Sequence, residues 1–243
     1  MHRLMVETEV LERSTVELSD KAARHLKVLR PRPGERIELF DGRGRYRIYS
    51  YDGALVAAAG IGEEPPPAGG LELFACVTKG SRWDWTLEKA TELGVTRIVP
   101  VVSERTIVRI GADEREAKRQ RWLRVVEDAS RQSGSRWVPE VLPAQSFGDA
   151  LEMAAATECF AGALTDPPSP GIMAALKRKG IFDAPAGEMR LSTFIGPEGD
   201  FTPGELEALL RIATPVSFGP RVLRAETAAI FALGVLMGAK DMV

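Results

Sequence analysis

The alternation of apolar and polar residues predicts short β-strands in the first quarter of the chain. Three runs have the period of two that places alternate side chains on opposite faces of a strand, at 36–40, 46–51 and 54–59. Glycine-containing turns separate these runs. Before them, apolar residues spaced three or four apart from Ala22 to Leu29 predict one amphipathic helix, which Pro31 ends. We therefore expect a small β-barrel that carries a single helix.

From residue 71 onward the pattern changes to apolar runs that alternate with amphipathic segments. The apolar runs predict strands at 71–77, 98–102, 159–165, 191–195 and 216–218, with a short one at 138–142. The amphipathic segments predict helices at about 82–93, 113–133, 147–156, 171–179, 203–213 and 226–239. Strands and helices that alternate at these lengths form a parallel sheet with helices on both faces. Ligands of such sheets bind at the carboxyl ends of the strands.

A segment rich in proline and glycine, residues 63–70, separates these two regions. Consecutive prolines are stiff and consecutive glycines are flexible, a combination that is typical of a linker between domains. The sequence therefore predicts a first domain over residues 1–68 and a second over residues 71–243.

Length and composition are those of a globular protein with its own hydrophobic core. The chain has 243 residues, of which 44% are hydrophobic and 27% are charged. Its longest nearly apolar run, 228–239, is shorter than the roughly 20 residues that cross a bilayer. The first residues turn acidic at Glu7 before any apolar signal segment develops, so we expect a cytoplasmic protein without a membrane partner. Cys76 and Cys159 lie in apolar runs and are predicted to be buried free thiols.

The net charge is small, but the charged residues are unevenly distributed along the chain. A net charge of −2 argues against a nucleic-acid binder that relies on bulk positive charge, yet basic residues exceed acidic ones up to residue 136 and acidic ones exceed basic ones afterwards. Of the 32 basic residues 24 are arginine, whose planar guanidinium suits phosphates and base edges, although GC-rich coding produces the same excess. With only His2 and His25 and two distant cysteines, we expect neither a metal site nor a Ser-His-Asp hydrolase.

Two predicted strand ends carry the residues best suited to chemistry. After the strand at 191–195, glycines in 196–201 let the backbone approach a ligand closely, and Glu198 offers an acceptor. After the strand at 216–218, the segment 219–227 places an apolar pair between two arginines just before a helix. Tight turns and helix capping explain the same residues without a function. Neither loop matches the P-loop or the G-x-G-x-x-G pattern, which disfavours nucleoside triphosphates and NAD.

Several segments together resemble the RsmE family, ribosomal RNA small subunit methyltransferase E. They are KGSRWDWTLEKATELGV at 79–95, SER at 103–105, IGPEGDF at 195–201 and LRAETA at 223–228. The resemblance extends over nearly the whole chain, because residues 24–30 and 40–42 match the N-terminal domain of the family. It implies a PUA-like β-barrel followed by a SPOUT-type α/β domain with a C-terminal trefoil knot, and it implies a homodimer.

The resemblance also implies methylation of a uridine at N3 in the 16S rRNA of the small ribosomal subunit, with S-adenosylmethionine as the methyl donor. Carried onto this chain, the cofactor-binding residues are Leu164, Thr165, Ile195, Gly196, Pro197, Glu198, Gly199, Phe218, Gly219, Val222, Leu223, Arg224 and Glu226. Transfer from a sulfonium is an in-line displacement, which needs positioning and removal of the N3 proton.

Two of these residues are the catalytic candidates. We expect Arg224 to stabilise the negative charge that develops on the uracil, and Glu198 to orient the cofactor or to accept a proton. Glu226 is a further candidate for the role of Glu198. A purely structural ion pair between Arg224 and Glu226 is the alternative.

A base that is methylated at N3 must leave its stack, so basic residues of both domains are expected to hold the flanking phosphates. The candidates are Arg24, Lys27, Arg30, Lys79, Arg82 and Arg131. A merely solvated helix face is the alternative for those in the first domain.

This chain departs from the family pattern at a few positions. Asp200 stands where the family usually has glycine, Arg131 stands where it has an acid, and the arginine at 136 is displaced by one position. These departures concern the contact with RNA and leave the cofactor and the reaction class unchanged.

Two other functions remain open from the sequence. One is a methyltransferase of the same superfamily that acts on tRNA. The other is a noncatalytic RNA-binding or ribosome-assembly protein in which both loops are only turns. Binding of S-adenosylmethionine separates this second alternative from the enzymes.

Overall fold

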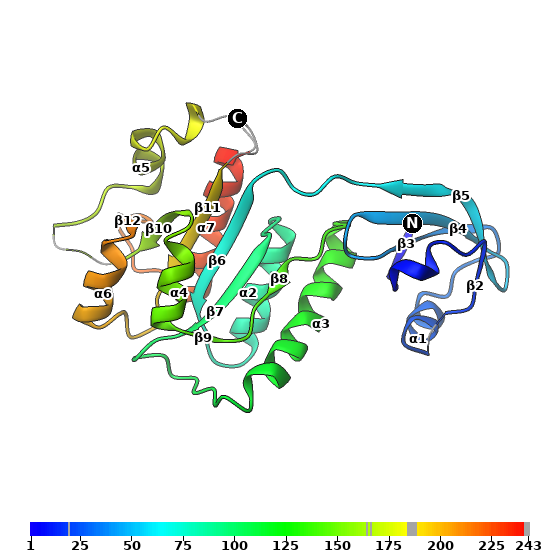
Figure 1. Cartoon of the computed structure of the whole chain (residues 1–243), viewed down its shortest axis with the longest axis horizontal. Coiled ribbons are helices and arrows are strands. Elements are labelled where there is room, and N and C mark those ends of the chain that lie inside the picture. The colour runs from blue at the N-terminus through cyan, green and yellow to red at the C-terminus, as the bar shows by residue number, and fades with distance from the viewer. Residues whose placement is uncertain (19, 164, 166, 184–188, 241–243) are drawn as a thin grey trace. The chain divides into compact units, whose positions relative to one another are not determined.

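The computed structural model describes residues 1–18, 20–163, 165, 167–183 and 189–240, and only the backbone of residues 20–22, 25, 27 and 240 (Figure 1). These residues form two compact units. The smaller unit contains Met1–Pro66 together with Glu127–Val138, and the larger unit contains Pro67–Val126 and Pro139–Val243. The segment that returns to the smaller unit begins inside the long helix α3 (Arg115–Ser133).

A five-stranded sheet, a half-barrel, forms the smaller unit. Its strand order is β1-β3-β4-β5-β2, in which β1 runs parallel to β3 and the other neighbours are antiparallel. The elements are β1 (His2–Met5), η1 (Thr8–Val10), β2 (Thr15–Val16), α1 (Asp20–Leu29), β3 (Glu35–Phe40), β4 (Arg45–Tyr51) and β5 (Leu55–Glu63). Within the described residues no pairing joins the edge strands β1 and β2, so the sheet does not close into the expected barrel.

A buried carboxylate joins three segments of this unit. Glu38 on β3 is 1% exposed; its Oε1 lies 2.6 Å from Arg3 Nη2 on β1, and its Oε2 lies 2.7 Å from Arg136 Nη2. The Arg136 guanidinium also stacks over the Tyr46 ring at 3.5 Å. Burial alone would raise the pKa of Glu38. Hydrogen bonds from Arg136 and Arg3 lower the pKa by more than burial raises it, so the net effect is a lowered pKa. Arg136, displaced relative to the family pattern, thus attaches the returning segment to the half-barrel.

The larger unit is built on a parallel sheet, as the alternating pattern predicts. Its main strand order is β12-β10-β11-β6-β7-β8, and β9 also pairs with β7. The strands are β6 (Gly70–Cys76), β7 (Arg97–Val102), β8 (Glu140–Val141), β9 (Gln145–Ser146), β10 (Glu158–Gly162), β11 (Arg190–Ile195) and β12 (Ala213–Val216). β10 ends at Gly162 and not at residue 165, and β12 lies at 213–216 where a strand was predicted at 216–218. Residues 163, 217 and 218 therefore lie in loops at the carboxyl edge.

Helices cover both faces of this sheet (Figure 1). On one face α7 (Ala225–Lys240) packs on β6 and β11 and beside α2 (Ser81–Glu92). On the other face α4 (Phe147–Ala154) and α6 (Pro203–Leu210) enclose a core that includes Phe74, Phe194 and Phe201. The remaining elements are α5 (Ile172–Arg178) and η2 (Ile181–Asp183). Among the described residues, no helix combines the length and the apolar content needed to span a bilayer.

Cys76 and Cys159 are buried free thiols in this core, which confirms the prediction. Burial raises the pKa of Cys76 to about 11 and that of Cys159 to about 12. Both therefore remain protonated at neutral pH, where a thiol is a poor nucleophile.

We predict that Glu38→Gln lowers the free energy of unfolding by about 2 to 4 kcal/mol at neutral pH, because a neutral amide leaves two guanidiniums without their counter-charge. Folding lowers the pKa of Glu38, so its contribution is complete above the unfolded pKa and is lost as pH falls through the folded value. Urea unfolding at neutral and acidic pH should show that the difference in free energy of unfolding between wild type and variant shrinks below about pH 4. A gap independent of pH would contradict this account.

Candidate functional site

The carboxyl ends of three neighbouring strands surround a cavity of about 330 Å³ in the larger unit. The lining begins at the last residue of each strand: residues 195–198 and 200 from β11, residues 216–219, 221–225 and 228 from β12 onward, and Gly162 and Ala163 from β10. A volume of this size is within the range of roughly 300 to 1,000 Å³ that small-molecule sites have. The structure therefore brings the two predicted loops together in one site.

The first loop, residues 196–202, has a backbone that its own sequence constrains. A Cβ atom at Gly196 would lie 3.0 Å from the Phe201 ring, and Phe201 is 4% exposed in the core. The Asp200 N–H donates to the Pro197 carbonyl at 3.0 Å and closes a turn. Asp200 has a φ of +59°, in the left-handed region, and its Oδ1 accepts from the Phe201 N–H at 2.8 Å. Aspartate is one of the few residues with a side chain that tolerate this region, where glycine is favoured.

A second segment, residues 103–106 after β7, holds this loop from the other side. Arg105 Nη1 donates to the carbonyls of Gly199 at 3.1 Å and Phe201 at 3.3 Å. The Glu104 N–H donates to Glu205 Oε1 at 2.8 Å, and Glu205 belongs to the capping box that begins α6. The loop is thus fixed between the core, the segment 103–106 and the start of α6.

The second loop, residues 217–224, depends on one aromatic ring. Phe218 lies so close to Gly162 that a Cβ atom there would clash with the ring, and it packs edge-on against Phe231 of α7 at 5.6 Å. Gly219 follows with a φ of +116°, which side chains rarely permit, and its N–H donates to Ser217 Oγ at 3.2 Å. The ring therefore anchors the loop between β10 and α7.

One arginine bridges the acidic residues of the two loops. Arg82, at the start of α2, places Nη1 3.5 Å from Glu198 Oε1 and Nε 3.9 Å from Glu226 Oε1. The other carboxylate oxygen of Glu226, Oε2, is buried without a hydrogen-bond partner among the described residues.

Arg224 differs from Arg82 in having no acidic partner. It lines the cavity, is exposed, and forms no side-chain hydrogen bond or ion pair with any residue that the structure describes. The ion pair between Arg224 and Glu226 that the sequence left open is not formed there, because Glu226 faces Arg82 instead.

Most of the cofactor-binding residues predicted from the sequence line this cavity. They are Ile195, Gly196, Pro197, Glu198, Phe218, Gly219, Val222, Leu223 and Arg224. Leu164 lies outside the described residues. Thr165, Gly199 and Glu226 are not in the lining: the Thr165 hydroxyl bonds to the Pro167 carbonyl and Ser169 Oγ, Gly199 lies against Arg105, and Glu226 faces Arg82.

Further lining residues were missed by the sequence prediction. They are Gly162, Ala163, Asp200, Val216, Ser217, Ala225 and Ala228, while Arg221 lies within the predicted second loop. Asp200 was noted only as a departure beside the loop. For Gly162 and Ala163 a signal existed, since Gly162 ends β10 and Ala163 follows it, but the strand was predicted to continue to residue 165.

The predicted RNA-binding residues fall into three places. Arg24 and Arg131 line one cavity of the smaller unit, where Arg131 also pairs with Asp128 at 2.7 Å. Arg30 lines a second cavity of that unit. Lys79 and Arg82 lie at the start of α2 in the larger unit, and the side chain of Lys27 lies outside the described part of the chain. Within that part, no cluster of three or more His, Cys, Asp or Glu residues is arranged to hold a metal ion.

Known proteins share these features. Residues 65–237 match the RNA methyltransferase domain family, and residues 18–48 match the RNA methyltransferase PUA domain family. A ribosomal RNA small subunit methyltransferase E of Synechocystis is 34% identical over 242 residues, which cover 96% of this chain and 76% of that protein.

Two solved structures have the same fold over nearly their full length. One is a ribosomal RNA small subunit methyltransferase E of Neisseria gonorrhoeae bound to S-adenosylmethionine, with a TM-score of 0.80 and 29% identity, covering 98% of this chain and 97% of that one. The other is a methyltransferase of Legionella pneumophila with the same bound cofactor, with a TM-score of 0.81, 29% identity and the same coverage.

We predict that the backbone at Asp200 tolerates glycine and rejects a branched side chain. Asp200→Val should lower the free energy of unfolding by about 2 kcal/mol, since valine is disfavoured at positive φ and cannot accept the Phe201 N–H. Asp200→Gly should change it by less than about 1 kcal/mol, since the relieved backbone offsets the lost hydrogen bond. Thermal unfolding measures both, and equal destabilisation by the two variants would remove the left-handed backbone as the cause.

Proposed function

The chain belongs to the ribosomal RNA small subunit methyltransferase E family, so it is an enzyme that methylates ribosomal RNA with S-adenosylmethionine, and we propose that its target is N3 of a uridine in 16S rRNA. One observation carries this proposal: the two segments with the strongest family resemblance, 195–201 and 223–228, meet at one cavity. A protein in which both segments were only turns would not need them to enclose a common space.

The cavity fits the cofactor in its chemistry. Apolar side chains of Ile195, Val222 and Leu223 suit the adenine ring, and the glycine backbone of both loops allows close approach. Glu198 supplies a carboxylate in the lining, which complements the positive charge of a sulfonium.

S-adenosylmethionine supplies an electrophilic methyl group for an in-line displacement. We assign Arg224 to the uracil carbonyl oxygens, where its unpaired guanidinium stabilises the negative charge left when the N3 proton departs. Glu198 is the proposed proton acceptor or cofactor-orienting residue, and Arg82 holds it near Glu226.

The same proposal includes a SPOUT-type knot in the larger unit, with functional domains over residues 1–68 and 71–243. The packing of α7 supports the knot. This helix follows the second loop directly and packs on β6 and β11, and the first loop emerges from β11. The proposal further places the enzyme in the cytoplasm, where ribosomal RNA is its substrate.

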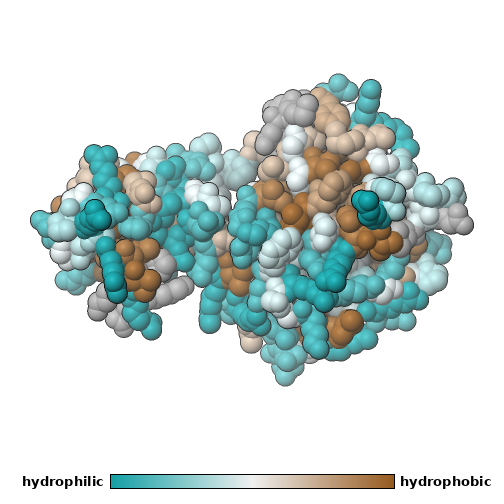
Figure 2. Space-filling model, turned by 180° about the vertical axis from the view of Figure 1, so that it is seen from behind, coloured by the Kyte–Doolittle hydropathy of each residue, from teal (hydrophilic) through white to brown (hydrophobic). Residues whose placement is uncertain are grey.

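The proposal also includes a homodimer through the α7 face. Phe231 on α7 and Trp85 on α2 are each 42% exposed, and Val222 in the second loop is 78% exposed. Figure 2, seen from behind, shows apolar atoms gathered on this side of the larger unit. Large exposed apolar side chains on neighbouring elements are typical of a surface that a second chain covers.

Transfer of label tests the function directly. Purified protein with methyl-labelled S-adenosylmethionine should label small ribosomal subunits and leave bulk tRNA unlabelled. Mass mapping of 16S rRNA should then show a single 3-methyluridine that is missing from cells lacking this chain. Label in tRNA alone would favour the tRNA enzyme, and no heat of cofactor binding in calorimetry would favour a noncatalytic RNA-binding protein.

We predict that Arg224→Ala lowers kcat by about 100-fold or more, because the Arg224 guanidinium acts on the transition state. The variant should still fold, and its Kd for the cofactor should stay within about twofold of the wild-type value. Single-turnover methylation of small subunits measures the rate, and calorimetry measures cofactor binding. Arg211→Gln is the charge-matched control, since Arg211 is exposed at the end of α6 and pairs with Glu207. Normal turnover by Arg224→Ala would remove Arg224 from the mechanism.

A further inference from the structure

A second carboxylate lines the cavity of the larger unit. Asp200 belongs to the first loop, as Glu198 does, and it stands where the family usually has glycine. The chemistry of methyl transfer assigned above gives Asp200 no role. Its side chain therefore adds to the site a negative charge that a glycine at this position lacks.

The carboxylate of Asp200 is held in place by the turn to which it belongs. With a φ of +59°, Asp200 donates its N–H to the Pro197 carbonyl at 3.0 Å, and its Oδ1 accepts from the Phe201 N–H at 2.8 Å. Phe201 is buried in the core, so this contact fixes the carboxylate beside the cavity. The other oxygen, Oδ2, has no hydrogen bond within the described residues.

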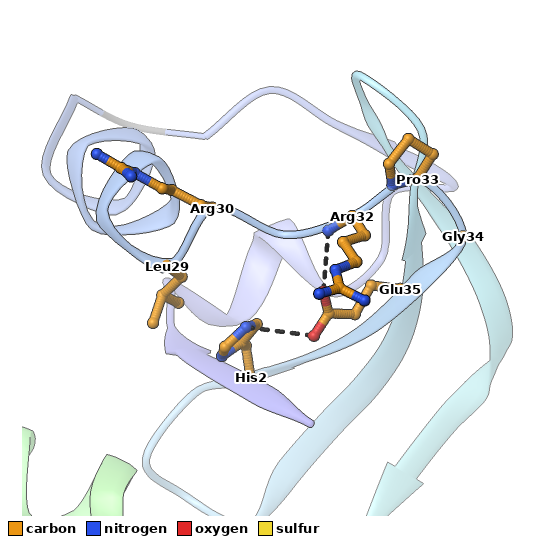
Figure 3. A pocket seen from close by; sticks show the side chains of 7 residues that line it. All are labelled: His2, Leu29, Arg30, Arg32, Pro33, Gly34 and Glu35. Atoms are coloured by element: carbon orange, nitrogen blue, oxygen red, sulfur yellow. Dashed lines mark hydrogen bonds and ion pairs between the residues drawn. The ribbon is translucent and has the colours of Figure 1, made fainter.

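Other carboxylates that line cavities of this protein lie beside a basic side chain. Glu198 Oε1 lies 3.5 Å from Arg82 Nη1 in the same cavity. In a cavity of the smaller unit, Glu35 Oε1 lies 3.2 Å from His2 Nε2 (Figure 3). Asp200 forms no ion pair with any residue that the structure describes. Its negative charge therefore stays available to a ligand of the cavity.

Methyl transfer changes the charge of the ligand in such a cavity. S-adenosylmethionine carries a sulfonium, an ammonium and a carboxylate, so its net charge is positive. The new bond to N3 uses the electron pair left when the N3 proton departs, and the pair of the broken bond stays on sulfur. The product, S-adenosylhomocysteine, is therefore neutral overall. A carboxylate near the sulfur attracts the methyl donor and finds no positive charge at the sulfur of the product.

We propose that Asp200 makes the cavity favour S-adenosylmethionine over S-adenosylhomocysteine, so that the spent cofactor leaves more readily. The unpaired carboxylate stabilises the sulfonium, and this attraction is lost once the methyl group has been transferred. Arg221 and Arg224 line the same cavity and act in the opposite sense, but they are unchanged in every variant of Asp200. The inference rests on the proposed function, which makes S-adenosylmethionine the ligand.

Calorimetric titration with three ligands tests the proposal. The probes are S-adenosylmethionine, S-adenosylhomocysteine and sinefungin, an unreactive analogue in which an ammonium group replaces the methylsulfonium. Asp200→Asn removes the charge but keeps an acceptor for the Phe201 N–H and tolerates the left-handed backbone. It should raise the Kd of the two ligands that carry this extra positive charge about three- to tenfold and leave that of S-adenosylhomocysteine within about twofold.

The ratio of these Kd values is the decisive quantity. S-adenosylhomocysteine shares the adenine, the ribose and the ammonium group of the methionine part with S-adenosylmethionine. If Asp200 bound one of these shared groups, Asp200→Asn would raise the Kd of both ligands equally, and an unchanged ratio would overturn the proposal. Product inhibition gives a second readout: relative to the KM for S-adenosylmethionine, the inhibition constant of S-adenosylhomocysteine should fall in Asp200→Asn.

Two further variants separate the charge at this position from folding and from total charge. Asp200→Gly restores the residue that the family usually has, and it should lose as much discrimination as Asp200→Asn while it remains folded in a thermal melt. Glu207→Gln removes one negative charge from the exposed surface of α6, where Glu207 pairs with Arg211, and should leave all three Kd values unchanged. An equal loss of discrimination in Glu207→Gln would overturn the proposal, because total charge would then explain the effect.

Failure of this inference is distinguishable from failure of the proposed function. Wild-type protein that binds S-adenosylmethionine and labels small subunits, together with Asp200 variants of unchanged Kd ratio, would overturn the role of Asp200 alone. Wild-type protein that binds none of the three ligands and labels no RNA would overturn the proposed function, and this inference with it.

Discussion

The site depends on one packing constraint: two phenylalanine rings lie against two glycines at the ends of parallel strands. Phe201 covers Gly196, which follows β11, and Phe218 covers Gly162, the last residue of β10. A Cβ atom at Gly196 would lie 3.0 Å from the Phe201 ring, and one at Gly162 would clash with the Phe218 ring. Phe201 continues into the aromatic cluster of the core, and Phe218 contacts Phe231 of α7. Loops are usually the mobile part of a fold, but these are fixed by the close-packed core itself. A cavity built on irregular backbone can therefore keep one shape.

Packing fixes the backbone of both loops, and the charged side chains around the cavity then decide which chemistry the site can support. Arg82 lies close to one carboxylate from each loop, Glu198 and Glu226, and so limits the negative charge beside the cavity. Arg224 in the second loop keeps its guanidinium without a protein partner among the described residues. The result is a cation available where the proposed reaction develops negative charge.

Periodicity in the sequence predicted the parallel sheet and its helices, because buried strands and amphipathic helices leave patterns that are local in sequence. It missed β1 and β2, which have four and two residues, too few to show a period. It placed the last strand at 216–218, whereas β12 covers Ala213–Val216, so the two share only Val216. The contacts of Arg82 and Arg105 could not be predicted from the sequence, for a different reason. Their partners lie about 100 residues away in sequence, and only tertiary packing brings them together.

The abundance of arginine can be sorted by what each guanidinium contacts. One group holds buried carboxylates, with Arg3 and Arg136 at Glu38 and Arg97 and Arg190 at Glu72. These arginines are needed for folding, because a buried carboxylate without counter-charge is costly. Others line cavities without a side-chain partner among the described residues, namely Arg30, Arg32, Arg43, Arg221 and Arg224. Unpaired guanidiniums on fixed backbone retain their hydrogen-bonding capacity for a ligand, and an RNA methyltransferase meets its negative charge in RNA.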